Sequence, residues 1–199
     1  YGLNWAYNGT SSSGLAPAGE KTEGCVPAAG EHNGRNALAA MAVARYLGVP
    51  AEDAVRAISA YKAPAMRQQV VEAGGLLIID DSYNASPDSM RSAIDVLSTR
   101  QVPGRKAAVL ADMLELGDFA HQGHREVGEY ARSHGVELLV AVGPLSKELA
   151  AGYGEGAVWF ETNQQAIEYL KGTLRPGDAL LVKGSRGIAT AQLVAALQA

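Results

Sequence analysis

The sequence predicts an α/β fold: a Rossmann-like, mostly parallel sheet with helices on both faces, preceded by a helical segment. From residue 70 onward, short strand-like runs and longer helix-like runs alternate five times. The strand-like runs are continuously apolar, which is typical of strands buried on both faces. Short loops and repeated crossovers of this kind produce parallel strands with right-handed connections.

The first 63 residues differ from this pattern. Residues 1–31 are rich in Gly, Ser, Ala, Thr and Pro and show no sustained period, so we expect an irregular tail or the end of a preceding domain. Residues 32–63 are expected to be helical, with one helix over about 33–47 that Gly48 ends and a second that Pro50 begins. The segment 63–65 reads as a boundary, and residues 64–199 form the predicted α/β domain.

Within that domain, strands are expected near residues 75–81, 107–112, 137–143, 158–160 and 179–183. Ser86 is a good N-cap and Pro87 a good first helical residue, so a helix is expected to begin there. Thr162 and Gln165 have the spacing of a capping box ahead of a later helix.

Composition narrows the class of protein. The 199 residues are 47% hydrophobic and 19% charged, which is enough apolar material for a substantial core. A net charge of −4 without any Lys/Arg cluster argues against a nucleic-acid surface. The single cysteine, Cys25, excludes an internal disulfide framework. With no apolar run long enough for a membrane span and no signal-peptide pattern, we expect a cytoplasmic protein.

Polar residues follow several of the predicted strands. Asp80 and Asp81 end the first strand, Asp112 ends the second, and Lys183 ends the last, followed by Gly-Ser-Arg. The carboxyl ends of parallel strands share one edge of a sheet, which is where ligands bind in open α/β folds. Backbone N–H groups at nearby helix starts favour anions. This edge therefore suits a phosphorylated or carboxylate ligand.

Other polar residues give weaker signals. His121 and His124 invite a metal interpretation, but their spacing fits ordinary polar residues on a helix surface. No Cys or further His supports a metal site, so none is predicted. Arg67 stands in an irregular stretch between the two regions, from which it could reach a phosphate.

Four stretches together resemble the Mur ligase superfamily, in particular its D-alanyl-D-alanine-adding branch. They are GEHNGRNALAA at 30–40, DDSYNASPDSM at 80–90, ADMLELG at 111–117 and LVKGSRG at 181–187. The resemblance implies an ATP-dependent ligase of bacterial cell-wall synthesis. In such a ligase ATP phosphorylates the carboxylate of UDP-N-acetylmuramoyl-tripeptide, and the amine of D-alanyl-D-alanine attacks the acyl phosphate. It further implies that residues 64–199 are the C-terminal ligase domain and that residues 32–63 belong to the central ATP-binding domain.

The resemblance also implies roles for particular residues. The implied nucleotide-binding set is Asn33 and Asn36 at the adenine, Arg67 at the phosphates, Asp81 at the ribose, and Tyr83 and Asn84 beside it. The implied D-alanyl-D-alanine site consists of Asp112, Met113, Glu115, Leu116, Ser185 and Arg186. Arg67 and Lys183 are the implied catalytic residues. ATP and Mg²⁺ would be held mainly by the family's central domain, and the enzyme is expected to be a monomer.

The departures from the family pattern are as informative as the matches. No Gly-x-x-x-x-Gly-Lys-Ser/Thr occurs in the 199 residues, and the family's UDP-binding domain is missing. We therefore expect a C-terminal portion that is inactive alone and binds ATP with millimolar affinity at best, roughly −4 kcal/mol.

Two other classes remain open on the residues alone. A phosphoacceptor receiver domain needs paired acids, a later Asp and a Lys, but Asp112 follows the second strand rather than the third. A dinucleotide-binding module needs a Gly-x-Gly-x-x-Gly after the first strand, and none is present.

Overall fold

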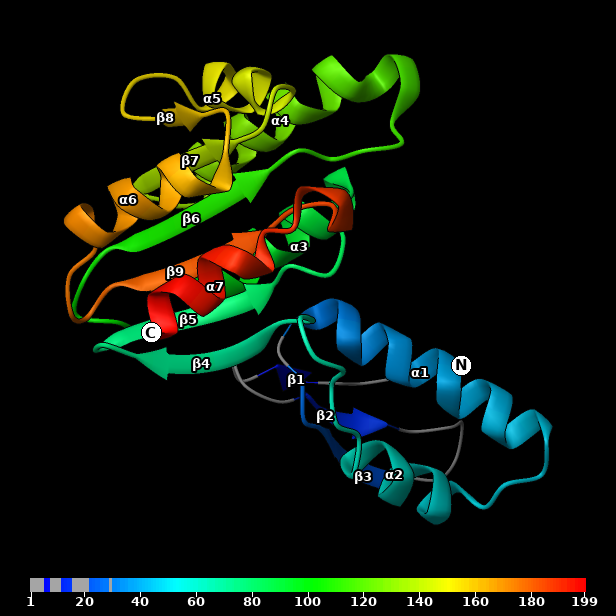
Figure 1. Ribbon diagram of the computed structural model, residues 1–199. Helices are drawn as coiled ribbons and strands as arrows, with labels where there is room; N and C mark the ends of the chain where they lie inside the picture. The colour runs from blue at the N-terminus through cyan, green and yellow to red at the C-terminus, as the bar shows by residue number, and fades with distance from the viewer. Residues whose placement is uncertain (1–5, 8–11, 16–21, 29) are drawn as a thin grey trace. The chain divides into compact units, whose positions relative to one another are not determined.

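The computed structural model describes residues 6–7, 12–15, 22–28 and 30–199 (Figure 1). The chain divides into two compact units, Tyr1–Ala63 and Pro64–Ala199. This division falls inside the segment 63–65 that the sequence marks as a boundary. Each unit is described by itself below.

The first unit combines a small antiparallel sheet with two helices. Its elements are β1 (Ala6–Tyr7), β2 (Ser12–Leu15), β3 (Thr22–Val26), α1 (Glu31–Tyr46) and α2 (Ala51–Ser59). The sheet has the order β1-β2-β3, and α2 packs against β3. The expectation that residues 1–31 are irregular is therefore wrong for these strands. Backbone pairing defines them, with Ser13 opposite Cys25, and pairing between such short segments leaves no hydrophobic period to detect.

The second unit is the predicted α/β domain. Its strands are β4 (Gln69–Ala73), β5 (Leu76–Asp81), β6 (Lys106–Ala111), β7 (Leu138–Val142), β8 (Val158–Phe160) and β9 (Ala179–Lys183). Its helices are α3 (Pro87–Ser98), α4 (Ala120–Ser133), α5 (Ser146–Tyr153), α6 (Asn163–Thr173) and α7 (Ala191–Gln198), with 3₁₀ turns η1 (Gly117–Phe119) and η2 (Arg186–Ile188). The sheet order is β4-β5-β9-β6-β7-β8.

Five of these six strands are parallel, which confirms the predicted fold class. β5, β9, β6, β7 and β8 pair in parallel in that order. The edge strand β4 is antiparallel to β5 and was not predicted. The predicted caps are confirmed: Ser86 and Thr162 each accept a hydrogen bond from the backbone N–H three residues later.

Helices cover both faces of the sheet, as Figure 1 shows. One face packs alternate strand residues such as Ile78, Val109 and Val182 against apolar residues of α6 and α7. On the other face lie α3, α4 and α5, and α4 and α5 are closely packed against each other. A Cβ on Gly128 would lie 2.0 Å from the Leu149 carbonyl oxygen, so this close crossing requires glycine. Covered on both faces, the sheet leaves its strand ends as the place where polar residues can gather.

Candidate ligand site at the carboxyl edge of the sheet

The carboxyl ends of β5, β9, β6 and β7 lie side by side and form what we call the carboxyl edge. Asp81 is the last residue of β5, and its neighbour in the sheet register is Lys183, the last residue of β9. Asp112 directly follows β6, and its backbone N–H donates to Val142 at the end of β7. The expectation that these strand-end residues share one edge is confirmed.

Asp81 and Lys183 form a buried ion pair. The Lys183 Nζ lies 2.6 Å from the Asp81 Oδ2, and the two side chains are 3% and 11% exposed. The same ammonium donates to the carbonyl oxygen of Asn84 at 2.9 Å. The Asp81 Oδ1 accepts from the backbone N–H of Gln68 at 3.2 Å. Lys183 therefore neutralises Asp81 and ties the turn after β5 to the neighbouring strand.

The second acid of the pair, Asp80, has a different partner. Its Oδ1 accepts hydrogen bonds from the backbone N–H of Ser82 at 3.1 Å and from the Ser82 hydroxyl at 2.5 Å. This is a local turn motif in which a carboxylate satisfies the backbone two residues ahead. Asp80 thus shapes the turn, whereas Asp81 joins two strands.

Two arginines lie against one aromatic ring beside this pair. The guanidinium carbon of Arg67 is 4.2 Å from the centre of the Tyr83 ring, and that of Arg186 is 5.6 Å from it. Both are cation–π distances. Arg67 and Arg186 are exposed, and among the described residues neither forms an ion pair. They are the cationic groups at this edge that an anion can reach.

The segment carrying Arg67 has an unusual backbone. Met66 and Gln68, on either side of Arg67, have positive φ angles of 61° and 52°. Hydrogen bonds hold the segment in place, because Tyr83 donates its N–H to the Met66 carbonyl at 3.1 Å and Gln68 donates to Asp81. Non-glycine residues in this conformation are strained, and such strain gathers at functional sites. The fold thus positions Arg67 at an energetic cost.

Hydrogen bonds connect the loop after β6 to the loop after β9. Ser185 donates its backbone N–H to the Asp112 carbonyl at 3.0 Å, and its hydroxyl accepts from the Leu114 N–H at 2.9 Å. The Asp112 Oδ1 accepts from both the N–H and the hydroxyl of Ser146, each at 2.7 Å. A Cβ on Gly143 would lie 2.5 Å from the Asp112 carboxyl carbon, so only glycine fits there.

Exposure divides the residues predicted to bind D-alanyl-D-alanine into two groups. Asp112, Met113 and Ser185 are at most 3% exposed, and hydrogen bonds within the protein use Asp112 and Ser185. Glu115 and Arg186 are exposed, and Leu116 is half-buried. The first group is buried within the protein, and the second presents side chains to solvent. Contact of any of them with the dipeptide stays a prediction.

The two residues predicted to contact adenine belong to the first unit. Asn33 and Asn36 are on α1 in the first unit, where Asn33 is half-buried and Asn36 exposed. Their predicted contact with adenine stays a prediction.

Sequence reasoning missed Ser146 and the role of His124. Ser146 begins α5 after a Gly-Pro turn, which was a usable signal for a helix start. The expectation that His124 is an ordinary polar residue on a helix surface is wrong, because His124 is fully buried and accepts a hydrogen bond from the Met113 N–H. Among the described residues, no three His, Cys, Asp or Glu side chains gather as metal ligands. No helix in the part of the chain that the structure describes is long and apolar enough to cross a membrane.

Fold and site together define a class: a Rossmann-like domain that presents cations at the carboxyl edge of its sheet, where α/β proteins bind anionic ligands. The chain matches the family model described as "Mur ligase, glutamate ligase domain" over residues 66–186. The chain belongs to the Mur ligase family. Because the chain belongs to this family, we reject the two alternative classes, a receiver domain and a dinucleotide-binding module.

Individual relatives point to one branch of the family. The chain is 35% identical over 175 residues to the UDP-N-acetylmuramoyl-tripeptide–D-alanyl-D-alanine ligase of Bacillus subtilis, covering 85% of this chain and 38% of that protein. It is 34% identical over 194 residues to the Escherichia coli ligase of the same name, covering 96% and 42%. The crystal structure of MurF from Acinetobacter baumannii superimposes with a TM-score of 0.89 at 32% identity, covering 98% and 43%. The chain thus spans about two fifths of the length of these relatives.

Proposed function

We propose that this chain is the C-terminal portion of an ATP-dependent ligase that joins D-alanyl-D-alanine to UDP-N-acetylmuramoyl-tripeptide. Relatives at 34–35% identity carry that activity in their names. The structural observation that carries the proposal is the meeting at one sheet edge of the Asp81–Lys183 pair with the exposed Arg67 and Arg186. A ligase of this kind needs cations there, because ATP, the tripeptide carboxylate and the acyl phosphate formed from them are all anionic.

The nucleotide side of the proposed site lies at the end of β5. A carboxylate can accept a hydrogen bond from a ribose hydroxyl, and its place at the end of β5 supports Asp81 as the ribose ligand. Arg67 suits a phosphate because its planar guanidinium can donate two parallel hydrogen bonds to phosphate oxygens. The Tyr83 ring lies against Arg67, and Lys183 fixes Asn84 through its carbonyl oxygen.

The dipeptide side comprises the loops after β6 and β9. The exposed Glu115 suits the ammonium group of D-alanyl-D-alanine, and the exposed Arg186 suits its carboxylate. Leu116 offers an apolar surface for the methyl groups. In this assignment the buried residues hold the two loops in place and do not contact the dipeptide. They are Asp112, Met113 and Ser185.

The proposed reaction has two steps. The tripeptide carboxylate attacks the γ-phosphorus of ATP, so that an acyl phosphate forms and ADP leaves. The dipeptide amine then attacks the acyl carbon, phosphate leaves, and the amine loses a proton as the amide forms. Arg67 would stabilise negative charge on the transferring phosphoryl group. Lys183 would act by holding Asp81 and the turn after β5.

The central domain of the family would supply the remaining groups. Mg²⁺ would be held mainly by that central domain, since the described residues offer no cluster of metal ligands. The 199 residues contain no Gly-x-x-x-x-Gly-Lys-Ser/Thr, so we expect no turnover by this chain alone. Turnover of the three substrates by the purified chain would contradict that expectation.

An NMR titration of the ¹⁵N-labelled chain tests the proposed site. Mg-ATP at millimolar concentration should shift signals of Arg67, Asp81 and Tyr83, and D-alanyl-D-alanine should shift those of Glu115, Leu116 and Arg186. L-alanyl-L-alanine is the matched control, since it has the same charges and opposite chirality. Equal shifts with both dipeptides, or shifts scattered over the surface, would count against the proposal.

A further inference from the structure

His124 is a fully buried ionisable side chain that the proposed reaction does not use. It lies on α4, and both of its ring nitrogens have partners. Its Nε2 is 2.9 Å from the backbone nitrogen of Met113, and its Nδ1 is 2.6 Å from the carbonyl oxygen of Ala120.

These two partners define one protonation state. The Met113 N–H can only donate, so Nε2 must be an unprotonated acceptor. The Ala120 carbonyl can only accept, so Nδ1 must carry the proton. The ring is therefore the neutral imidazole with its proton on Nδ1, and the charged form would lose the bond to Met113.

The bond to His124 completes a series of three anchors in the loop after β6. The Asp112 carbonyl accepts from the Ser185 N–H, the Met113 N–H donates to His124, and the Leu114 N–H donates to the Ser185 hydroxyl. Three consecutive residues are thus fixed, the middle one from α4 and the others from the loop after β9. Directly beyond them the chain turns outward at Glu115, whose φ is +65°.

We propose that His124 is a positioning residue that holds the Asp112–Gly117 loop in the conformation that presents Glu115 and Leu116. Without its acceptor, the buried Met113 N–H would have to find another partner, and a buried donor left unsatisfied is costly. The loop would then leave its present position. The consequence for D-alanyl-D-alanine rests on the proposed function, whereas the consequence for the loop does not.

The chain offers matched variants for the test. His124→Gln keeps an acceptor oxygen at about the position of Nε2, and His124→Leu removes it. His121→Leu alters the neighbouring histidine on α4, whose side chain is 75% exposed. Val127→Ala removes buried volume from the same helix and leaves the His124 acceptor in place, and so controls for lost stability.

The first measurement follows the loop itself. In the unaltered chain, imidazole ¹⁵N spectra should show a protonated Nδ1 and an unprotonated Nε2 at neutral pH. Hydrogen exchange of the Met113 N–H should be about tenfold or more faster in His124→Leu. It should be near the unaltered rate in His124→Gln, His121→Leu and Val127→Ala. The opposite tautomer, or unchanged exchange in His124→Leu, would overturn the proposal.

The second measurement is the D-alanyl-D-alanine titration. His124→Leu should weaken dipeptide binding about fivefold and leave Mg-ATP binding within twofold, and His124→Gln should restore the dipeptide affinity. Equal weakening in Val127→Ala would assign the effect to stability and overturn the positioning role. If the unaltered chain shows no dipeptide shifts, the proposed function fails for this site, and the Met113 exchange rates alone decide the role of His124.

Discussion

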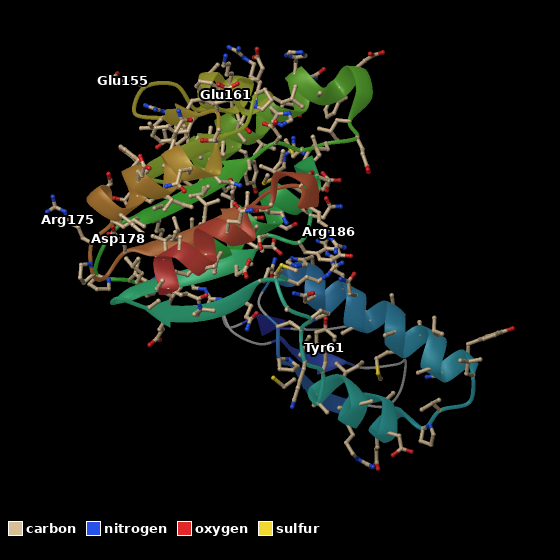
Figure 2. The ribbon with its side chains drawn as sticks, in the orientation of Figure 1. Tyr61, Glu155, Glu161, Arg175, Asp178 and Arg186 are labelled. Carbon is tan, nitrogen blue, oxygen red and sulfur yellow. The ribbon has the colours of Figure 1, made fainter. Side chains whose placement is uncertain are left out.

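At opposite ends of the six-stranded sheet, an aspartate is paired with a basic side chain from another element. Figure 2 labels Asp178 and Arg175 at one end and Arg186 at the other. Asp178 precedes β9 and pairs with Arg105 at 2.7 Å, whereas Asp81 ends β5 and pairs with Lys183 at 2.6 Å. The two pairs are similar in length but differ in their surroundings.

Both side chains of the pair at the amino end form further hydrogen bonds within the protein. The Asp178 carboxylate also accepts from the backbone N–H groups of Arg105 at 2.8 Å and of Arg175 at 3.1 Å. Arg105 donates in addition to the Thr173 carbonyl. At the carboxyl end, by contrast, Arg67 and Arg186 are exposed, lie over the Tyr83 ring and form no ion pair among the described residues. An ion pair does not by itself indicate a ligand site, and neither does one exposed cation near it, such as Arg175 at the amino end. The carboxyl end differs because two exposed arginines lie over one aromatic ring.

Removing Lys183 should have the largest effect on stability. Lys183→Met leaves the buried Asp81 carboxylate without its ammonium partner, which should lower the free energy of unfolding by about 3 kcal/mol. Asp81→Asn combined with Lys183→Met should recover most of that loss, because no buried charge remains, but should not recover nucleotide binding. Urea unfolding and Mg-ATP titration measure the two effects. A stability of Lys183→Met within 0.5 kcal/mol of the unaltered chain would contradict this prediction (about the range of a neutral surface change).

Asp178→Asn should have a smaller effect on stability and none on ligands. The change removes the charge but keeps an acceptor, and Arg105, at 36% exposed, can be solvated. We expect a loss of about 2 kcal/mol in urea unfolding, with unchanged Mg-ATP and dipeptide titrations. Asp88→Asn is the control, because Asp88 is 98% exposed in its ion pair with Arg91. Weakened ligand binding in Asp178→Asn would remove the distinction between the two ends.

The amino end should also contribute a pH dependence. Burial alone would raise the pKa of Asp178, but hydrogen bonds from the Arg105 side chain and backbone and from the Arg175 N–H outweigh it, so the pKa lies below its ordinary value. The unfolded chain then binds the proton more readily than the folded one. This stability is present above the ordinary carboxyl pKa of about 4 and is lost as pH falls through the lowered value.

Urea midpoints measured from pH 7 down to pH 3 test this dependence. Below about pH 4 the unaltered chain should lose stability more steeply than Asp178→Asn, so the two curves should converge. Asp88→Asn should instead follow the unaltered chain. Parallel curves for the unaltered chain and Asp178→Asn would mean that the pKa of Asp178 is not lowered by folding.

Most of the carboxyl edge was predictable because it depends on strand order along the chain. Continuous apolar runs located β5 and β9, so Asp81 and Lys183 could be placed at the same edge without the structure. The caps at Ser86 and Thr162 were predictable because a capping side chain and its partner are only three residues apart. Features that depend on residues close together in the sequence, or on a regular hydrophobic period, could thus be predicted.

Features that depend on residues far apart in the sequence could not be predicted. The bonds of Asp112 to Ser146 and of Met113 to His124 join separate elements, and no local pattern encodes them. The edge strand β4 was missed for another reason: it is partly exposed and lacks a continuous apolar run. The sequence did contain a signal for this strand, because a Gly-Gly pair is typical of the two-residue turns that join antiparallel strands. In the structure Gly74 and Gly75 form such a turn, and both have positive φ.

The smallest predicted effect concerns the ring between the two arginines. Tyr83→Leu removes the π-face against which Arg67 and Arg186 lie, while leaving both charges in place. A cation–π contact at an exposed site is worth about 0.5–1 kcal/mol, so Mg-ATP should bind about two- to fivefold more weakly. Tyr83→Phe should bind as the unaltered chain does, because the ring remains. Tyr46→Leu, at a tyrosine 89% exposed in the other unit, is the control. If Tyr83→Phe is as weak as Tyr83→Leu, the hydroxyl rather than the ring contributes to binding, and the exposed arginines of the carboxyl edge are positioned without the tyrosine.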